Sequence, residues 1–91
     1  MSEGTWVSSP FRWDGSLDGD LLVIGRGPGV VSVSVEIGEV EKATHWMYVE
    51  RVKAMPGVTE VFGLQIPVGA WVRLIFELPV GGGLLPLAKF L

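Results

Sequence analysis

Short runs of alternating apolar and polar residues, separated by glycine and proline, make up most of the chain. In the clearest run, residues 30–37, every second side chain is valine or isoleucine, with serine or glutamate between them. This alternation is typical of an antiparallel strand with one face on a core and the other toward water. No stretch repeats apolar residues at helical spacing for more than one turn. The pattern therefore predicts an all-β chain.

Turn signals divide the rest of the chain into further strands. Pro56-Gly57 and Pro67-Val68-Gly69 have the composition of tight turns, and Pro86 confines the last strand to an edge or terminal position. About six strands at this spacing favour a small antiparallel β-sandwich or barrel. The predicted strands span 20–25, 30–37, 44–54, 58–66, 71–78 and 84–91.

Two of these strands carry apolar side chains on both faces. In 44–54, Trp46, Tyr48 and Val52 are expected on one face, and Met47 and Val49 on the other. In 71–78, the even-numbered positions are all apolar, and the odd-numbered positions include Trp71 and Ile75. Strands of this kind are covered on both sides, which predicts that something packs on the second face.

The first 16 residues differ from the rest and are expected to form an extended N-terminal arm, followed by a β-sandwich domain at 17–91. They mix serine, glycine and proline with Trp6, Val7, Phe11 and Trp13, which are too apolar to stay in solvent. The arm is expected to dock on a neighbouring chain or on the domain's own sheet. If it docks on a neighbour, deleting 1–16 abolishes partner binding and leaves the domain folded.

The composition sharpens this expectation. A chain of 91 residues forms one domain, yet 48% of its residues are hydrophobic, more than one small core easily hides. No run approaches the roughly 20 apolar residues that a membrane-spanning helix needs. A net charge of −3 without a basic patch argues against nucleic acid as a partner. The excess is therefore expected at protein–protein interfaces, formed by Trp6, Val7, Phe11, Trp13, Trp46, Tyr48, Trp71 and Ile75.

The chain offers little for catalysis or cofactor binding. His45 is the only histidine and there is no cysteine, so no nucleophile–base set is indicated. Asp14, Asp18 and Asp20 lie close together, but their spacing does not match a calcium-binding loop and suits ordinary turns. The glycine-rich stretch 25–29 leads into a strand, whereas a nucleotide-binding loop leads into a helix. We expect no enzyme activity, no metal and no cofactor.

Four segments together resemble a known group of proteins. Residues 29–36 form a V-x-V strand, 43–50 a strand around Trp46, 56–58 a Pro-Gly-Val turn, and 67–74 a strand of the form P-x-G-x-x-V-R-L. This series is similar to small β-sandwich virion proteins of tailed bacteriophages, with jelly-roll or immunoglobulin-like folds, over residues 17–78. The resemblance implies a virion protein that decorates or cements the capsid. Such a protein self-associates, with a trimer favoured, and binds the major capsid protein or another virion protein.

The four tryptophans support an alternative, because exposed tryptophan stacks on sugar faces. The chain would then be a carbohydrate-binding or receptor-binding module of a phage tail or fibre. That alternative predicts an exposed tryptophan beside aspartate or arginine in a shallow groove.

The composition also bears on the source of the chain. The absence of asparagine and cysteine, with Gln65 the only glutamine, fits a thermophilic source.

Overall fold

The computed structural model describes residues 4–17, 19–80 and 83–91. Within these residues the chain forms strands, turns and irregular segments but no helix, which confirms the predicted all-β class. The eight strands are β1 (Thr5–Val7), β2 (Phe11–Arg12), β3 (Asp20–Ile24), β4 (Val31–Gly38), β5 (Met47–Ala54), β6 (Thr59–Gly63), β7 (Trp71–Glu77) and β8 (Leu87–Phe90).

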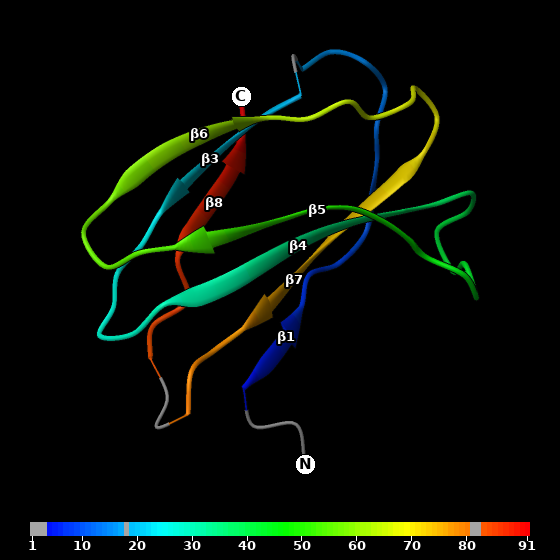
Figure 1. Cartoon of the computed structure of the whole chain (residues 1–91). Helices are drawn as coiled ribbons and strands as arrows, with labels where there is room; N and C mark the ends of the chain where they lie inside the picture. Colours follow the sequence, from blue (N-terminus) through cyan, green and yellow to red (C-terminus); the bar gives the residue numbers. More distant parts are fainter. Residues whose placement is uncertain (1–3, 18, 81–82) are drawn as a thin grey trace.

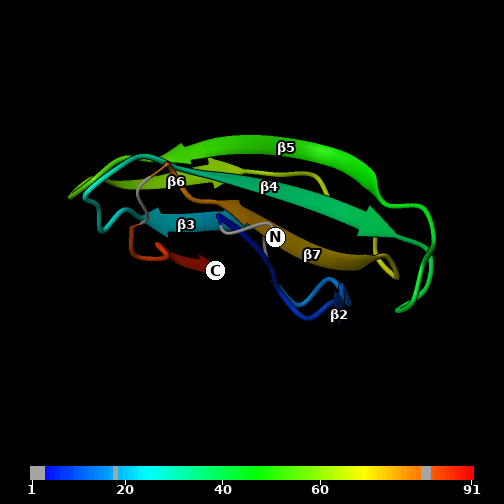
Figure 2. The same ribbon diagram turned by 90° about the horizontal axis from the view of Figure 1, so that it is seen from below.

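The strands form two antiparallel sheets that pack on each other as a small β-sandwich (Figure 1). The larger sheet has the strand order β1-β7-β4-β5, and β2 also pairs with β7. The smaller sheet has the order β6-β3-β8. The chain crosses from the larger sheet to the smaller one between β5 and β6, at the left of Figure 1. Figure 2 shows the sandwich from below, with β5 and β8 on opposite sides of the molecule.

Alternation along β4 and β3 builds the core between the sheets. Val31, Val33 and Val35 are buried on one side of β4, and Leu21 and Val23 are buried on one side of β3. Each such aliphatic side chain stabilises the fold by about 1.5–3 kcal/mol through its removal from water. The other buried hydrophobic residues are Trp13, Val52, Ala54, Leu64, Val72, Leu74 and Phe90.

The segment expected to form an arm belongs to the larger sheet. β1 and β2 both pair with β7, in registers that place Trp6 opposite Phe76 and Phe11 opposite Val72. These two short strands account for the difference from the six strands that the sequence indicates. The segment is therefore docked on the domain's own sheet, and the division at residue 16 does not separate it from the sandwich.

Strand β5 departs most from expectation. It begins at Met47 rather than at residue 44, and its register against β4 shifts part-way along the strand. A β-bulge adds one residue and reverses the facing of side chains beyond it. Val52 consequently faces the core while Tyr48 faces outward, so the prediction that Trp46, Tyr48 and Val52 share a face was wrong. Because β5 is also an edge strand with Met47 and Tyr48 exposed, it is not covered on both sides.

Two other expectations are confirmed. In β7, Val72 and Leu74 are buried in the core, while Trp71 and Ile75 lie half-buried on the opposite side. Pro86 directly precedes β8, an edge strand of the smaller sheet, where its missing N–H breaks no ladder.

Candidate protein–protein interface

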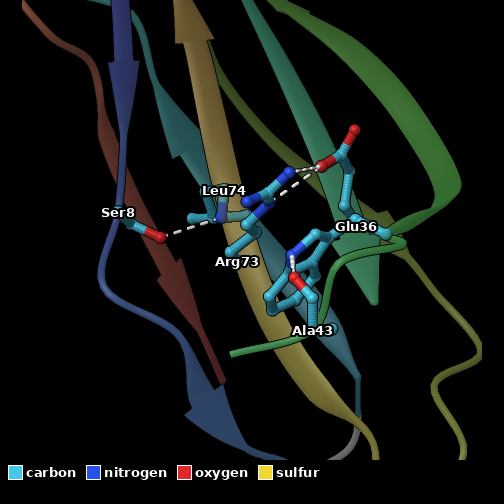
Figure 3. A network of polar contacts seen from close by, with 6 residues as sticks. Ser8, Glu36, Ala43, Arg73 and Leu74 are labelled. Atoms are coloured by element: carbon cyan, nitrogen blue, oxygen red, sulfur yellow. Dashed lines mark hydrogen bonds and ion pairs between the residues drawn. The ribbon is translucent and has the colours of Figure 1, made fainter. Parts of the chain in front are cut away.

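Trp6 and Val7 remain accessible although their backbone is fixed. The side chain of Trp6 is 56% exposed and that of Val7 is similarly open. The chain leaves β1 through Ser8, whose N–H donates to the Leu74 carbonyl and whose hydroxyl accepts from the Leu74 N–H, both at 2.8 Å. Figure 3 shows the hydroxyl contact. These bonds hold the two apolar side chains at the β1 edge of the larger sheet.

Phe11 and Trp13 are less exposed and form an aromatic cluster with Phe90 of the last strand. Ring centroids are 5.2 Å apart between Trp13 and Phe90, and 5.6 Å apart between Phe11 and Phe90, both edge-to-face. Trp13 is only 5% exposed. It is therefore a core residue, and its expected place at an interface with another chain does not fit this burial. A sequence pattern does not distinguish the two roles, because both need a large aromatic side chain in an extended segment.

Trp46 lies just before β5 and folds back over the outside of the larger sheet. Its ring lies over Gly38, where a Cβ atom would come within 3.2 Å of the ring. The indole Nε1 donates to the Ala43 carbonyl at 3.0 Å, and the guanidinium carbon of Arg73 lies 4.2 Å from the ring centroid. Because Gly38 has no side chain, there is space at this position for the Trp46 ring.

Arg73 is held in turn by Glu36 on the neighbouring strand (Figure 3). Arg73 Nη2 and Nε lie 2.7 and 2.9 Å from the same carboxylate oxygen of Glu36. The two side chains are 27% and 20% exposed, so the pair is only partly screened by water. Together, Trp46, Arg73 and Glu36 form a fixed polar and aromatic network on the outer surface.

Replacing Arg73 by alanine is expected to lower the free energy of unfolding by about 1–2 kcal/mol, because Glu36 loses its partner and the Trp46 ring loses its cover. Urea titration followed by far-UV circular dichroism measures the loss. The matched control is Glu77→Ala, which breaks an exposed ion pair and keeps the hydrogen bond from Arg51 to Ser34. Arg51 pairs with Glu77 at 3.2 Å, but the two side chains are 53% and 47% exposed. An exposed pair contributes less than about 1 kcal/mol. Equal losses in the two variants contradict a structural role for the Trp46 network.

The outer face of the larger sheet gathers five of the expected interface residues. Val7 lies opposite Ile75, Trp71 lies opposite Gly38, and Tyr48 follows on β5. The face is not uniformly apolar, because the Arg73–Glu36 and Arg51–Glu77 pairs lie between these side chains. The five residues are Val7, Trp46, Tyr48, Trp71 and Ile75.

A second apolar surface, which sequence reasoning missed, is the outer face of the smaller sheet. Its side chains alternate with the buried ones along β3, β6 and β8. Val61 and Leu87 are exposed at its two sides, and Leu22 lies half-buried at its centre. The available signal was the run 21–24, four apolar residues without alternation, which is typical of a strand buried on both faces.

The residues considered for metal binding or catalysis do not form a site in the part of the chain that the structure describes. No group of three histidine, cysteine or acidic side chains lies together there. His45 is exposed. Asp14 accepts from the Ser16 N–H at 2.9 Å in a local turn, and the hydrogen bonds to Ser16 lower the pKa of its carboxyl. Asp18 lies outside the described residues.

Two shallow hollows open on the surface of the described residues, and neither gathers the groups of an active site. The first lies beside Trp13 and has both polar and apolar walls. The second lies between β5 and β6 and carries charges of both signs. The first is lined by Trp13, Gly15, Leu17, Gly19, Leu64, Gln65, Ile66, Pro67 and Val68, the second by Glu50, Arg51, Val52, Lys53, Met55, Glu60 and Phe62.

No family model, curated protein or solved structure matches the chain. Over the residues that the structure describes, no helix is long and apolar enough to cross a membrane. The surface itself is therefore the source of any argument about function.

Proposed function

We propose that the chain is a non-enzymatic structural protein that associates with copies of itself and attaches to a protein lattice. The observation that carries this proposal is the set of large apolar side chains that the fold leaves exposed. Trp6, Met47, Tyr48 and Val61 are each more than half exposed. Tryptophan, tyrosine and methionine are enriched at surfaces where proteins bind one another.

We further propose the virion of a tailed bacteriophage as the place of action, with the chain as a capsid decoration or cement protein. The partner is then the major capsid protein or another virion protein, and a trimer is the favoured assembly. Support comes from the resemblance of residues 17–78 to such modules and from the two-sheet fold that carries them. Assembly stabilises the folded chain by mass action, because partners bind only the native surface.

Size-exclusion chromatography with light scattering tests self-association. The full chain is expected to elute at a multiple of its 9.8 kDa mass. Dilution is expected to shift the mass toward the monomer, since association depends on concentration. A mass of one chain at every concentration up to the millimolar range contradicts self-association.

The alternative of a carbohydrate-binding or receptor-binding module of a phage tail or fibre has one observation in its favour. Trp46 lies beside Arg73, although the guanidinium covers one face of the ring. Titration of tryptophan fluorescence with oligosaccharides, together with a glycan array, tests it. A saturable sugar response that disappears in Trp46→Ala favours the alternative over the structural role.

A further inference from the structure

The outer face of the smaller sheet is a small grid of nine side-chain positions. Its central strand β3 contributes Asp20, Leu22 and Ile24, and each of these has a neighbour on either side. Leu22 is flanked by Val61 and Lys89, and stands at the centre. The three rows across the sheet are Thr59–Ile24–Leu87, Val61–Leu22–Lys89 and Gly63–Asp20–Leu91, the last closed by the Leu91 N–H donating to the Asp20 carbonyl.

The outer face of the smaller sheet carries one acidic and one basic side chain beside its centre. On the larger sheet, two arginines pair with two glutamates within the chain. On the smaller sheet, Asp20 and Lys89 form no ion pair within the described residues. One carboxylate and one ammonium group thus flank an apolar centre without an ion-pair partner among the described residues, and a second copy would supply the opposite charge at each position.

The pattern is self-complementary under one particular two-fold rotation. A two-fold axis in the plane of the face, which passes through Leu22 at about 45° to the strands and runs near Thr59 and Leu91, exchanges the rows of one copy with the strands of the other. Lys89 then meets Asp20 of the second copy. Neighbouring strands lie about 4.8 Å apart, and successive side chains on one face of a strand lie about 6.7 Å apart. The mismatch of about 2 Å is within reach of the flexible lysine side chain.

The same rotation matches side-chain sizes. Leu22 meets Leu22 of the second copy on the axis, and Ile24 meets Val61. Leu87, which is exposed, meets Gly63, where there is no side chain. The strands of the two copies cross at nearly a right angle, one of the two arrangements in which sheets pack face to face.

The sheet edges disfavour the other way in which β proteins associate. The free edge of β5 carries a bulge and the charged residues Glu50, Arg51 and Lys53, and β1 is only three residues long. Bulges, charges and short edge strands prevent pairing between edges of different molecules. Contact through a face is therefore favoured over pairing at these two edges of the larger sheet.

We propose that two copies of this chain pack through the outer faces of their smaller sheets, crossed at nearly a right angle, with Lys89 of each against Asp20 of the other. This inference rests on the proposed self-association, assigns a surface to it, and takes a two-fold dimer in place of the trimer that the resemblance favours. The outer face of the larger sheet, with Trp46, Tyr48 and Trp71, then remains free for the lattice.

Charge reversal and charge exchange test the proposal on the full chain by analytical ultracentrifugation over a concentration series. Lys89→Glu and Asp20→Lys are each expected to weaken dimerisation at least tenfold, because the contact occurs twice across the axis. The double variant is expected to return the dissociation constant to within about threefold of the unmodified chain. Lys53→Glu reverses a charge of the same kind on the larger sheet and is expected to leave the constant unchanged.

The outcomes separate this inference from the proposed function. If the unmodified chain assembles and neither single variant weakens assembly, self-association stands and the assigned face is wrong. The same conclusion follows if both single variants weaken assembly and the double variant, folded by circular dichroism, does not restore it. If the unmodified chain is a monomer throughout, self-association and the assigned face are both overturned.

Discussion

Replacing Trp13 by alanine is expected to lower the free energy of unfolding by about 3–5 kcal/mol, a large share of the stability of a domain of this size. The indole is 5% exposed and lies edge-on against Phe90. Its removal leaves a cavity that three separate chain segments border, so collapse around it is limited. Urea unfolding followed by far-UV circular dichroism at fixed chain concentration measures the loss.

The control for this variant is Trp6→Ala, which removes the same side chain from a position 56% exposed. It is expected to change the free energy of unfolding by less than about 1 kcal/mol. If Trp6→Ala destabilises the chain as much as Trp13→Ala, the assignment of Trp13 to the core is contradicted. The burial of Trp13 also changes the expected result of deleting residues 1–16. The deletion now unfolds the domain, because it removes β1, β2 and a core side chain together.

Replacing Gly25 by alanine is expected to cost at least about 3 kcal/mol, the upper end of the range for overpacking. A Cβ atom at this position would stand 2.5 Å from the carbonyl carbon of Met55, where the chain crosses from β5 to β6. Hydrogen bonds fix the approach, since Gly25 donates to Val58 and accepts from Gly57. The clashing atoms belong to the backbone of Met55, so a change of side-chain rotamer cannot relieve the clash. Thermal and urea unfolding measure the loss.

The matched control is Gly63→Ala in the smaller sheet. A Cβ atom at Gly63 would have the Asp20 carboxylate oxygen at 3.7 Å as its nearest neighbour, an ordinary contact. This variant is expected to stay within about 1 kcal/mol of the unmodified chain, since alanine restricts the unfolded chain more than glycine does. A loss as small for Gly25→Ala as for Gly63→Ala contradicts the close backbone approach.

Much of the fold could be predicted from particular residues. The strand at 30–37 matches β4 closely, because strict alternation of valine and serine satisfies both a core and a wet face. The turns at Pro56-Gly57 and Pro67-Val68-Gly69 lie between strands as expected, and Gly57 and Gly69 adopt positive φ angles. These features depend on residues that are close together in the chain, so they can be predicted from the sequence.

The candidate interface could be predicted only in part. Val7, Tyr48, Trp71 and Ile75 do reach one outer face, but Phe11 and Trp13 face inward. Alternation divides the side chains of a strand into two sets, but it does not tell which set packs against the second sheet. The face around Leu22 was missed for a second reason. Its residues come from three strands that are far apart in the chain, and the sequence does not show that these strands are neighbours.

The sequence by itself determined the class of fold, the places of most strands and the excess of apolar side chains. Only the tertiary structure decided where that excess lies. A bulge in β5 turned Tyr48 outward, and a close approach fixed Gly25 against Met55. Contact with the Phe90 ring drew Trp13 into the core. Periodicity is a property of neighbours in the chain, whereas facing and burial arise from contacts between residues far apart in it.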